Sequence, residues 1–226
     1  MRAPVGSAGL CVQLVRIAGP AAVVAGLAFV VASACQSSRD ETRERWQKVP
    51  EIVAALGVRG GSSVADIGAG RGFFTVKLAQ AVGRTGRVYA VDVAADDLRR
   101  LRDRVDDEGL SQVTVVEGDV RDPRLEPGSI DAALIVNAYH EMREHQAMLA
   151  GIRRALRPGG RLVIVEPIMP DRRGEPRDRQ ESRHEIEPRY AAADLDAAGF
   201  DLLELRDPFT TRPEGDVEWL IVATPR

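Results

Sequence analysis

Short apolar runs rich in β-branched residues alternate along most of the chain with longer stretches whose apolar residues recur at helical spacing. The clearest strand-like runs are Ser63–Ile67, Arg87–Val93, Val113–Glu117, Ile130–Val136 and Arg161–Glu166. Helical spacing occurs in Val49–Leu56, Phe73–Val82, Ala95–Glu108 and Glu141–Leu156. This alternation predicts an α/β domain with a parallel sheet, right-handed crossovers and helices on both faces.

The last part of the chain breaks this rhythm. Phe200–Arg206 and Glu218–Thr224 are strand-like, but no helix joins them, which predicts an antiparallel pair at the end of a doubly wound, mostly parallel sheet. Asp171–Arg189 is charged and contains prolines, so we expect a mobile insertion before a last helix near Ala191–Ala198.

The first 35 residues have a different composition. Ile17–Ala34 contains no charged residue, and Arg2 and Arg16 precede it. This layout is typical of a secretory signal peptide. Small residues directly before Cys35 resemble the end of a bacterial lipoprotein signal, in which Cys35 would be lipidated, although Ala32 stands where that signal usually has Leu. We therefore predict that the protein is exported or attached to a membrane through residues 17–35.

Two alternatives remain for this segment. An apolar run of 18 residues is about long enough to serve as a membrane anchor. The real translation start could also lie further along the chain, and the protein would then be cytoplasmic. The predicted organisation is a signal peptide or anchor at 1–35, a polar linker at 36–44 and one folded domain at 45–226.

Composition narrows the partners of that domain. A net charge of −3 and a pI near 5.7 give no overall basic field, so no nucleic-acid partner is expected and a small substrate fits better. Cys11 and Cys35 both precede the folded part, which leaves no disulfide and no cysteine metal site within it.

The most informative segment is Val64–Gly72, an apolar strand that ends in three glycines at alternate positions and is followed by a helix. Glycines allow close approach of the backbone to a ligand, and the helix start offers free N–H groups. A dinucleotide fingerprint would place its third glycine where Phe73 stands, but here it is Gly72, so pyrophosphate binding fits less well. The alternative is a tight turn without a ligand.

Two carboxylates follow the next two strands. Asp92 closes the second strand, 24 positions after Gly68, where it could accept hydrogen bonds from both hydroxyls of a ribose. Asp119 follows the third strand, and a solvated turn is the alternative reading for it. Because the carboxyl ends of parallel strands share one edge of a sheet, the three signals together predict a ligand site there.

The pattern Asp-x-Gly-x-Gly-x-Gly resembles motif I of the class I S-adenosylmethionine-dependent methyltransferases, and the resemblance covers about residues 45–224. It implies a Rossmann-like fold, S-adenosylmethionine as cofactor and methyl transfer to a small molecule or a lipid. By the same resemblance, the cofactor residues are Asp66, Gly68, Gly70, Gly72, Asp92, Asp119 and Asn137.

The reaction site is expected where the fourth strand ends. Asn137 falls at the motif IV position, but no Asn-Pro-Pro-Tyr or Asp-Pro-Pro-Tyr follows, which disfavours an amino-nitrogen methylase acting on DNA or protein glutamine. Methyl transfer is an in-line displacement from an activated sulfonium, so a base is needed only for a poor nucleophile. His140 is the candidate catalytic base, because histidine titrates near neutrality; the alternative is a histidine that packs at a helix start.

A metal site is not predicted. The residues after the fourth strand include His140, Glu141, Glu144 and His145. Their register does not match His-Glu-x-x-His, which would need histidine at position 144, or the inverted motif, which would need His140 one residue later. His184 and Glu185 in the charged insertion could reach over the substrate pocket, or simply lie in a solvated loop.

Two other functions compete with methyl transfer. An NAD(P)-dependent oxidoreductase is weakened by the glycine spacing and by the absence of a Tyr-x-x-x-Lys pair, since Arg143 stands four residues after Tyr139. A non-catalytic methyltransferase-like domain could instead bind a ligand at the membrane without turnover.

Overall fold

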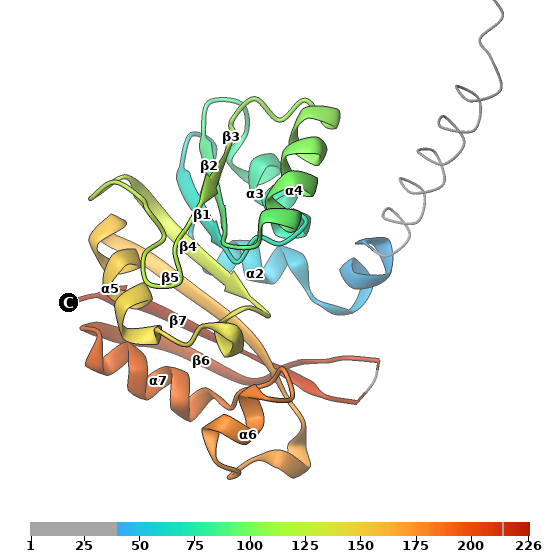
Figure 1. Ribbon diagram of the computed structural model, residues 1–226, viewed down its shortest axis with the longest axis vertical. Coiled ribbons are helices and arrows are strands. Elements are labelled where there is room, and N and C mark those ends of the chain that lie inside the picture. The colour runs from blue at the N-terminus through green and yellow to red at the C-terminus, as the bar shows by residue number, and fades with distance from the viewer. Residues whose placement is uncertain (1–39, 214) are drawn as a thin grey trace, which may run out of the picture. The chain divides into compact units, whose positions relative to one another are not determined.

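The computed structural model describes residues 40–213 and 215–226, and residues 43–226 form one compact unit. Within that unit a single mixed sheet has the strand order β3-β2-β1-β4-β5-β7-β6 (Figure 1). Its strands are β1 (Ser63–Ile67), β2 (Arg87–Asp92), β3 (Val113–Glu117), β4 (Ile130–Val136), β5 (Leu156–Ile168), β6 (Phe200–Thr211) and β7 (Val217–Pro225).

Strands β1 to β5 pair parallel with one another, whereas β7 pairs antiparallel with both β5 and β6. The predicted doubly wound sheet with an antiparallel C-terminal pair is therefore confirmed. The reversal of strand order falls between β1 and β4, and ligands of open α/β sheets bind beyond the carboxyl ends of strands at such a point.

Helices cover both faces of the sheet, as predicted. The helices are α2 (Val49–Ala55), α3 (Phe73–Val82), α4 (Ala95–Asp107), α5 (His145–Ala155), α6 (Arg177–Glu181) and α7 (Pro188–Ala197). Buried side chains of α2 and α3 pack with Val64, Leu134 and Val163 on one face, while those of α5 and α7 pack with Ile135, Ile164 and Ile221 on the other. Alternate residues of each strand thus point to opposite cores.

The helix expected over Glu141–Leu156 is shorter than predicted. Residues 139–141 form a separate 3-10 turn, η1 (Tyr139–Glu141), and α5 begins only at His145. The side chain of Glu166 explains the break, because its Oε1 accepts the backbone N–H groups of Ala138 and Tyr139 at 2.7 and 2.6 Å. Glu166 therefore holds both N–H groups and fixes η1 to the end of β5.

The prediction of a mobile insertion at Asp171–Arg189 was wrong. This segment contains a 3-10 turn, η2 (Pro170–Arg172), and α6, and the side chain of Gln180 is fully buried. The Gln180 amide donates to the carbonyls of Arg172 and Glu175 and to the carboxylate of Glu187, and its oxygen accepts the N–H of Glu187. Internal hydrogen bonds allow this polar segment to fold.

The predicted signal segment, residues 1–35, lies outside the described residues. Among the residues that the structure describes, no helix has the length and apolar character needed to cross a bilayer. The predicted linker, residues 36–44, includes Arg43 and Glu44, but these two residues are helical and begin the compact unit.

Candidate functional site

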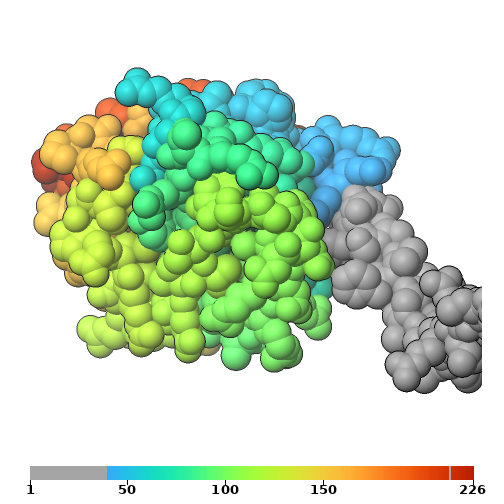
Figure 2. Space-filling model, turned by 90° about the horizontal axis from the view of Figure 1, so that it is seen from above, coloured from blue at the N-terminus to red at the C-terminus, as the bar shows by residue number. Residues whose placement is uncertain are grey.

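A cavity of about 560 Å³ opens beyond the carboxyl ends of β1, β2 and β4. Its walls include Gly68, Gly70, Asp92, Asp119 and Asn137, five of the seven predicted cofactor residues. The other lining residues are Ile67, Val91, Val93, Ala94, Asp97, Val120, Ala138, Glu141, Met142, Arg143, Glu144 and Met148. The volume is in the range of small-molecule and cofactor sites. In Figure 2, the green surface that includes α4 adjoins the yellow-green surface of residues near 120–140, and both segments contribute residues to the cavity walls.

The glycine loop meets the cavity through Gly68 and Gly70. Both have positive φ, 75° and 53°, a region that side chains rarely adopt. A Cβ on Gly68 would lie 2.4 Å from the Cβ of Ala138, whereas a Cβ on Gly70 would meet no atom within 4 Å. Gly68 thus lets the end of β1 pack against the end of β4, and Gly70 leaves open space where a ligand can approach the backbone.

Asp66 and Gly72 lie behind the cavity wall. A Cβ on Gly72 would lie 2.7 Å from Cδ1 of Leu101, so this glycine permits close packing of the loop against α4. Asp66 is almost fully buried and accepts a hydrogen bond from the hydroxyl of Thr75 at 2.6 Å. Burial raises the pKa of Asp66 to about 6, although the Thr75 hydroxyl and the charge of Arg43 act in the opposite direction.

Asp92 organises the loop as well as facing the cavity. Its Oδ2 accepts the N–H of Gly70 at 2.8 Å, and its Oδ1 accepts the N–H groups of Val93 and Ala94 at 2.8 and 2.9 Å. A carboxylate has about four lone-pair sites, so one site on Oδ2 remains for a ligand hydroxyl. For Asp92 to accept hydrogen bonds from both hydroxyls of a ribose, as the sequence predicts, one of its lone-pair sites would have to be shared between a hydroxyl and a backbone N–H group.

The far end of the cavity combines Asp119 with two apolar side chains. Oδ1 of Asp119 accepts the N–H of Arg121 at 3.0 Å, which stabilises the turn after β3. Val93 and Val120 line the same cavity and are 53% and 58% exposed, unusually high for large hydrophobic residues. A flat apolar ring placed beside Asp119 would cover them.

Asn137 lies at the other end of the cavity, directly after β4. Its φ is 54°, and its backbone N–H donates to the carbonyl of Val165. Oδ1 of Asn137 is buried without a hydrogen-bond partner. Because an unsatisfied buried acceptor is costly, this atom is suited to a donor supplied by a ligand.

His140 is buried next to the cavity, in contact with Glu166 rather than among the lining residues. Its Nδ1 lies 2.6 Å from Oε2 of Glu166, whose own side chain is fully buried. Burial lowers the pKa of His140, but the hydrogen bond and charge of Glu166 outweigh it, and the pKa is raised. The carboxylate holds the proton of the neutral ring on Nδ1, which leaves Nε2 as an acceptor.

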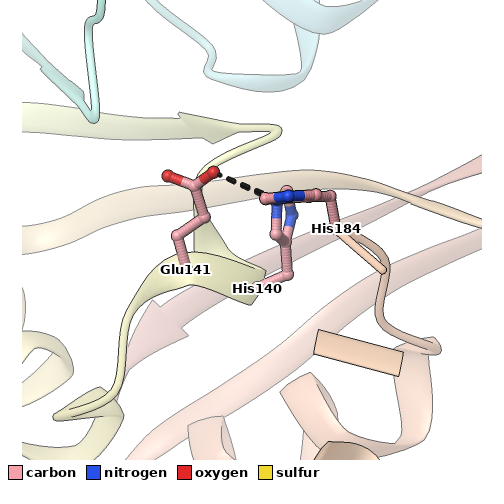
Figure 3. A group of neighbouring side chains, drawn as sticks. All are labelled: His140, Glu141 and His184. Carbon is pink, nitrogen blue, oxygen red and sulfur yellow. Dashed lines mark ion pairs between the residues drawn. The ribbon is translucent and has the colours of Figure 1, made fainter. Parts of the chain in front are cut away.

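The folded insertion brings His184 to the same place. Glu141 lies beside the two neighbouring histidines, with Oε1 3.7 Å from Nε2 of His140 and 3.4 Å from Nδ1 of His184 (Figure 3). From the sequence, the reach of His184 over the pocket was one of two alternatives, and Glu166 was not predicted as a site residue. The sequence signal that could have identified Glu166 is its position as a lone carboxylate at the end of the apolar run Arg161–Glu166.

A second buried network fixes the segments around η1. The hydroxyl of Tyr139 donates to Asp194 on α7 at 2.7 Å, and Arg177 on α6 pairs with the same carboxylate at 2.8 Å. Arg177 also pairs with Glu181, whose carboxylate lies 3.6 Å from Nε2 of His145. Polar and charged side chains from four elements therefore hold η1, α5, α6 and α7 together.

Comparisons with known proteins agree with this geometry. Residues 64–160 match the family model described as methyltransferase domain. An uncharacterised 37.1 kDa protein of a Streptomyces fradiae transposon is 41% identical over 116 residues, which are 51% of this chain and 33% of that protein. A ubiquinone/menaquinone biosynthesis C-methyltransferase of Teredinibacter turnerae is 32% identical over 122 residues, 54% of this chain and 48% of that protein. The chain thus spans between a third and about half of the length of these curated relatives.

Solved structures share the fold over a longer stretch. A SAM-dependent methyltransferase from Aquifex aeolicus has a TM-score of 0.70 at 21% identity, over 84% of this chain and 96% of that one. A geranyl diphosphate methyltransferase in complex with GPP and sinefungin has a TM-score of 0.64 at 19% identity, over 80% and 78%. The Rossmann-like fold expected from the resemblance to class I methyltransferases is confirmed.

Proposed function

We propose that the protein transfers the methyl group of S-adenosylmethionine to a small organic or lipid acceptor. The observation that carries this proposal is the cavity beyond β1, β2 and β4, which joins the open backbone of Gly70, the carboxylates of Asp92 and Asp119 and the unsatisfied oxygen of Asn137. The match of residues 64–160 to a methyltransferase domain and the fold shared with such enzymes support it.

The chemistry of the cavity walls fits the two ends of this cofactor. Asp92 would accept a ribose hydroxyl, and the exposed side chains of Val93 and Val120 would cover the adenine ring beside Asp119. The oxygen of Asn137 would accept a hydrogen bond from the ammonium group of the methionine end. When bound, the cofactor supplies a methyl group on a sulfonium, so the protein has only to hold the acceptor in line and exclude water.

We call His140, Glu141, Glu166 and His184 the acceptor side, because His140 and Glu141 follow the strand end that carries Asn137, Glu166 contacts His140, and His184 contacts Glu141, which lines the cavity. A lipid acceptor is supported by relatives whose names refer to ubiquinone, menaquinone and demethylmenaquinone. This chain has no basic field that would favour a nucleic acid, which leaves small molecules and lipids as the acceptor classes.

The first experiment measures ligand binding. The full-length protein in mild detergent is titrated by calorimetry with S-adenosylmethionine, S-adenosylhomocysteine and NAD. We expect micromolar dissociation constants for the first two, a loss of at least tenfold in Asp92→Asn, and no change in Asp107→Asn, an exposed carboxylate at the end of α4. Binding of NAD alone would make the protein an oxidoreductase.

The second experiment measures turnover. S-adenosylmethionine with a tritiated methyl group is incubated with the protein and, separately, with a lipid extract and a water-soluble extract. Label in the organic phase identifies a lipid acceptor, and label in the aqueous products identifies a small soluble one. Binding of S-adenosylmethionine without transfer in either arm would instead support the non-catalytic domain.

We also propose that residues 17–35 attach the protein to a membrane, with Cys35 as the lipidated residue. The support is the sequence pattern alone: an uncharged stretch after two arginines, with small residues before the cysteine. Metabolic labelling with palmitate should mark the wild-type protein and leave Cys35→Ser unlabelled and Cys11→Ser unaffected. Equal recovery of all three in the soluble fraction, without label, would favour a cytoplasmic protein.

A further inference from the structure

We infer that His140, Glu141 and His184 bind a divalent transition-metal ion, with Zn²⁺ as the best match, at the border between the cofactor cavity and solvent. Among the described residues these three bring their nitrogen and oxygen atoms within 4.8 Å of one another (Figure 3). The register of sequence motifs argues against a metal here, but the folded insertion supplies the second histidine from a separate segment.

The distances suit a metal ion after small side-chain adjustments. Oε1 of Glu141 lies 3.7 Å from Nε2 of His140 and 3.4 Å from Nδ1 of His184. In a tetrahedral site with bonds of about 2.0–2.1 Å, neighbouring ligand atoms are about 3.3 Å apart. Two histidines and one glutamate form a ligand set used by catalytic zinc, in which the fourth position stays open.

The surroundings of His140 match those of metal-bound histidines. Such a histidine almost always donates its other ring N–H to a carboxylate, which fixes the tautomer and the ring orientation. Glu166 accepts from Nδ1 of His140 at 2.6 Å and is itself held by the N–H groups of Ala138 and Tyr139. The lone pair of Nε2 is therefore directed toward Glu141.

The backbone also holds His184 in place. Its φ is 59°, a left-handed conformation that is uncommon for residues other than glycine. On its C-terminal side, Glu185 accepts hydrogen bonds from the N–H of Met169 and the guanidinium of Arg172, and the N–H of Ile186 donates to the carbonyl of Pro167. A solvated histidine in a loop needs none of these restraints, whereas a ligand at a defined position does.

The position of the ion gives it a chemical role, which rests on the proposed function. Glu141 lines the cofactor cavity, and the side chains of Glu141 and His184 are 64% and 75% exposed, so an acceptor can reach the open position. An acceptor hydroxyl bound there loses its proton to water, because the ion lowers the pKa of the hydroxyl. The oxygen then forms a bond to the methyl carbon while the carbon–sulfur bond breaks and leaves its electron pair on sulfur. The acceptor class is a small molecule or lipid with an ionisable hydroxyl, such as a phenol or an enol.

Binding of Co²⁺ tests the site without reference to activity. The full-length protein, carrying no polyhistidine tag, is treated with a chelator, dialysed and titrated with Co²⁺ while visible absorption is recorded, and Zn²⁺ is then used to displace the Co²⁺. We expect one ion per chain, absorption typical of a four- or five-coordinate ion, and micromolar or tighter affinity. His184→Ala and Glu141→Gln should each weaken binding at least tenfold.

Controls separate this inference from the proposed function. Glu144→Gln removes another cavity-lining carboxylate close to Glu141 and should leave metal affinity unchanged. Because His184 and Glu141 are exposed, their substitutions test the site without unfolding the protein. Equal affinity in the wild type and in His184→Ala, or no binding at millimolar Co²⁺, overturns the metal site. S-adenosylmethionine is titrated into the same samples, so failure of the cofactor proposal is scored independently.

Discussion

The two sides of the site are built in different ways. The cofactor side, formed by β1, β2 and the loops that follow β1, β2 and β3, relies on backbone geometry: positive φ at Gly68 and Gly70 and N–H groups gathered by Asp92. The acceptor side relies on ionisable side chains gathered around the buried pair of Glu166 and His140. The first arrangement is specified within short stretches of sequence, and the second only by the completed fold.

This difference predicts that substitutions on one side leave the other side intact. Changes in the glycine loop should lower the affinity for the cofactor and change the stability of the domain near the loop. Changes around Glu166 should leave cofactor affinity almost unchanged. Sites without shared contacts usually behave additively. The four substitutions that follow test this separation.

The largest effect is expected for Gly68→Ala. The added Cβ would lie 2.4 Å from the Cβ of Ala138 at a φ of 75°, so backbone strain and overpacking together should cost about 2–4 kcal/mol. Urea unfolding measures the loss, and calorimetry should show S-adenosylmethionine affinity reduced at least 100-fold. The matched control is Gly109→Ala, with φ of 62° and no atom near the new Cβ, which should cost only about 1 kcal/mol through strain. Equal losses in both variants would contradict the role given to the contact.

Asp66→Asn should change how stability depends on pH. The pKa of Asp66 is raised from 3.8 to about 6 by burial, so its contribution to stability is fully present below pH 3.8 and is lost as pH rises through about 6. Between pH 4 and 7, the wild type should lose roughly 2.4 kcal/mol relative to the variant. Urea unfolding without cofactor measures this, with the exposed Asp107→Asn as control. Parallel pH curves for the wild type and Asp66→Asn would show that Asp66 titrates normally.

Glu166→Gln should affect only the acceptor side. The amide can still accept the N–H groups of Ala138 and Tyr139, but its NH₂ would face Nδ1 of His140 and move the ring proton to Nε2. We expect a loss of about 2 kcal/mol of stability and a change of histidine tautomer visible by ¹⁵N NMR. Affinity for S-adenosylmethionine should stay within threefold. A large loss of cofactor affinity would show that the two sides are coupled.

Tyr139→Phe is the smallest change. It removes the hydrogen bond to Asp194, while Arg177 still pairs with that carboxylate, so about 1 kcal/mol of stability should be lost. Burial and the charge of Asp194 hold the pKa of Tyr139 far above its usual range, so the loss should be the same from pH 6 to pH 9. Thermal unfolding at several pH values checks this, with Tyr190→Phe as the control. A loss that disappears at pH 9 would mean that the phenol ionises.

The sequence predicted that several residues meet at one edge of the sheet, where they line the cavity, because the signals for that position are local. Gly68, Gly70 and Asp92 could be placed from the end of one strand and the start of the next helix, since strand ends of a parallel sheet share an edge. Gly72 and Asp66 were assigned to the cofactor by resemblance, yet they lie behind the wall and serve packing and charge. Whether such a residue lines the cavity or lies behind its wall depends on neighbours from α4 and α3, which no local sequence pattern reveals.

The contacts of the acceptor side could not be predicted, because they also depend on neighbours from other elements. Glu166 and His140 are 26 residues apart in sequence, and their meeting requires β4 and β5 to pair in register. The charged composition of residues 171–189 indicated a solvated loop, because the pattern gives no sign that Gln180 and Glu187 satisfy each other's hydrogen bonds in the interior. Buried polar groups are recognised only together with their partners.

The position of β7 has a consequence for how the protein folds. The last strand of the chain lies inside the sheet, between β5 and β6, and carries the buried side chains of Trp219, Leu220 and Ile221. During synthesis, β1 to β4 can pair as they emerge, but β6 has no partner until β7 has been made. Pairing over such sequence separation is slow and leaves apolar edges uncovered for longer. Synthesis of β7 therefore sets the earliest time at which the sheet can close.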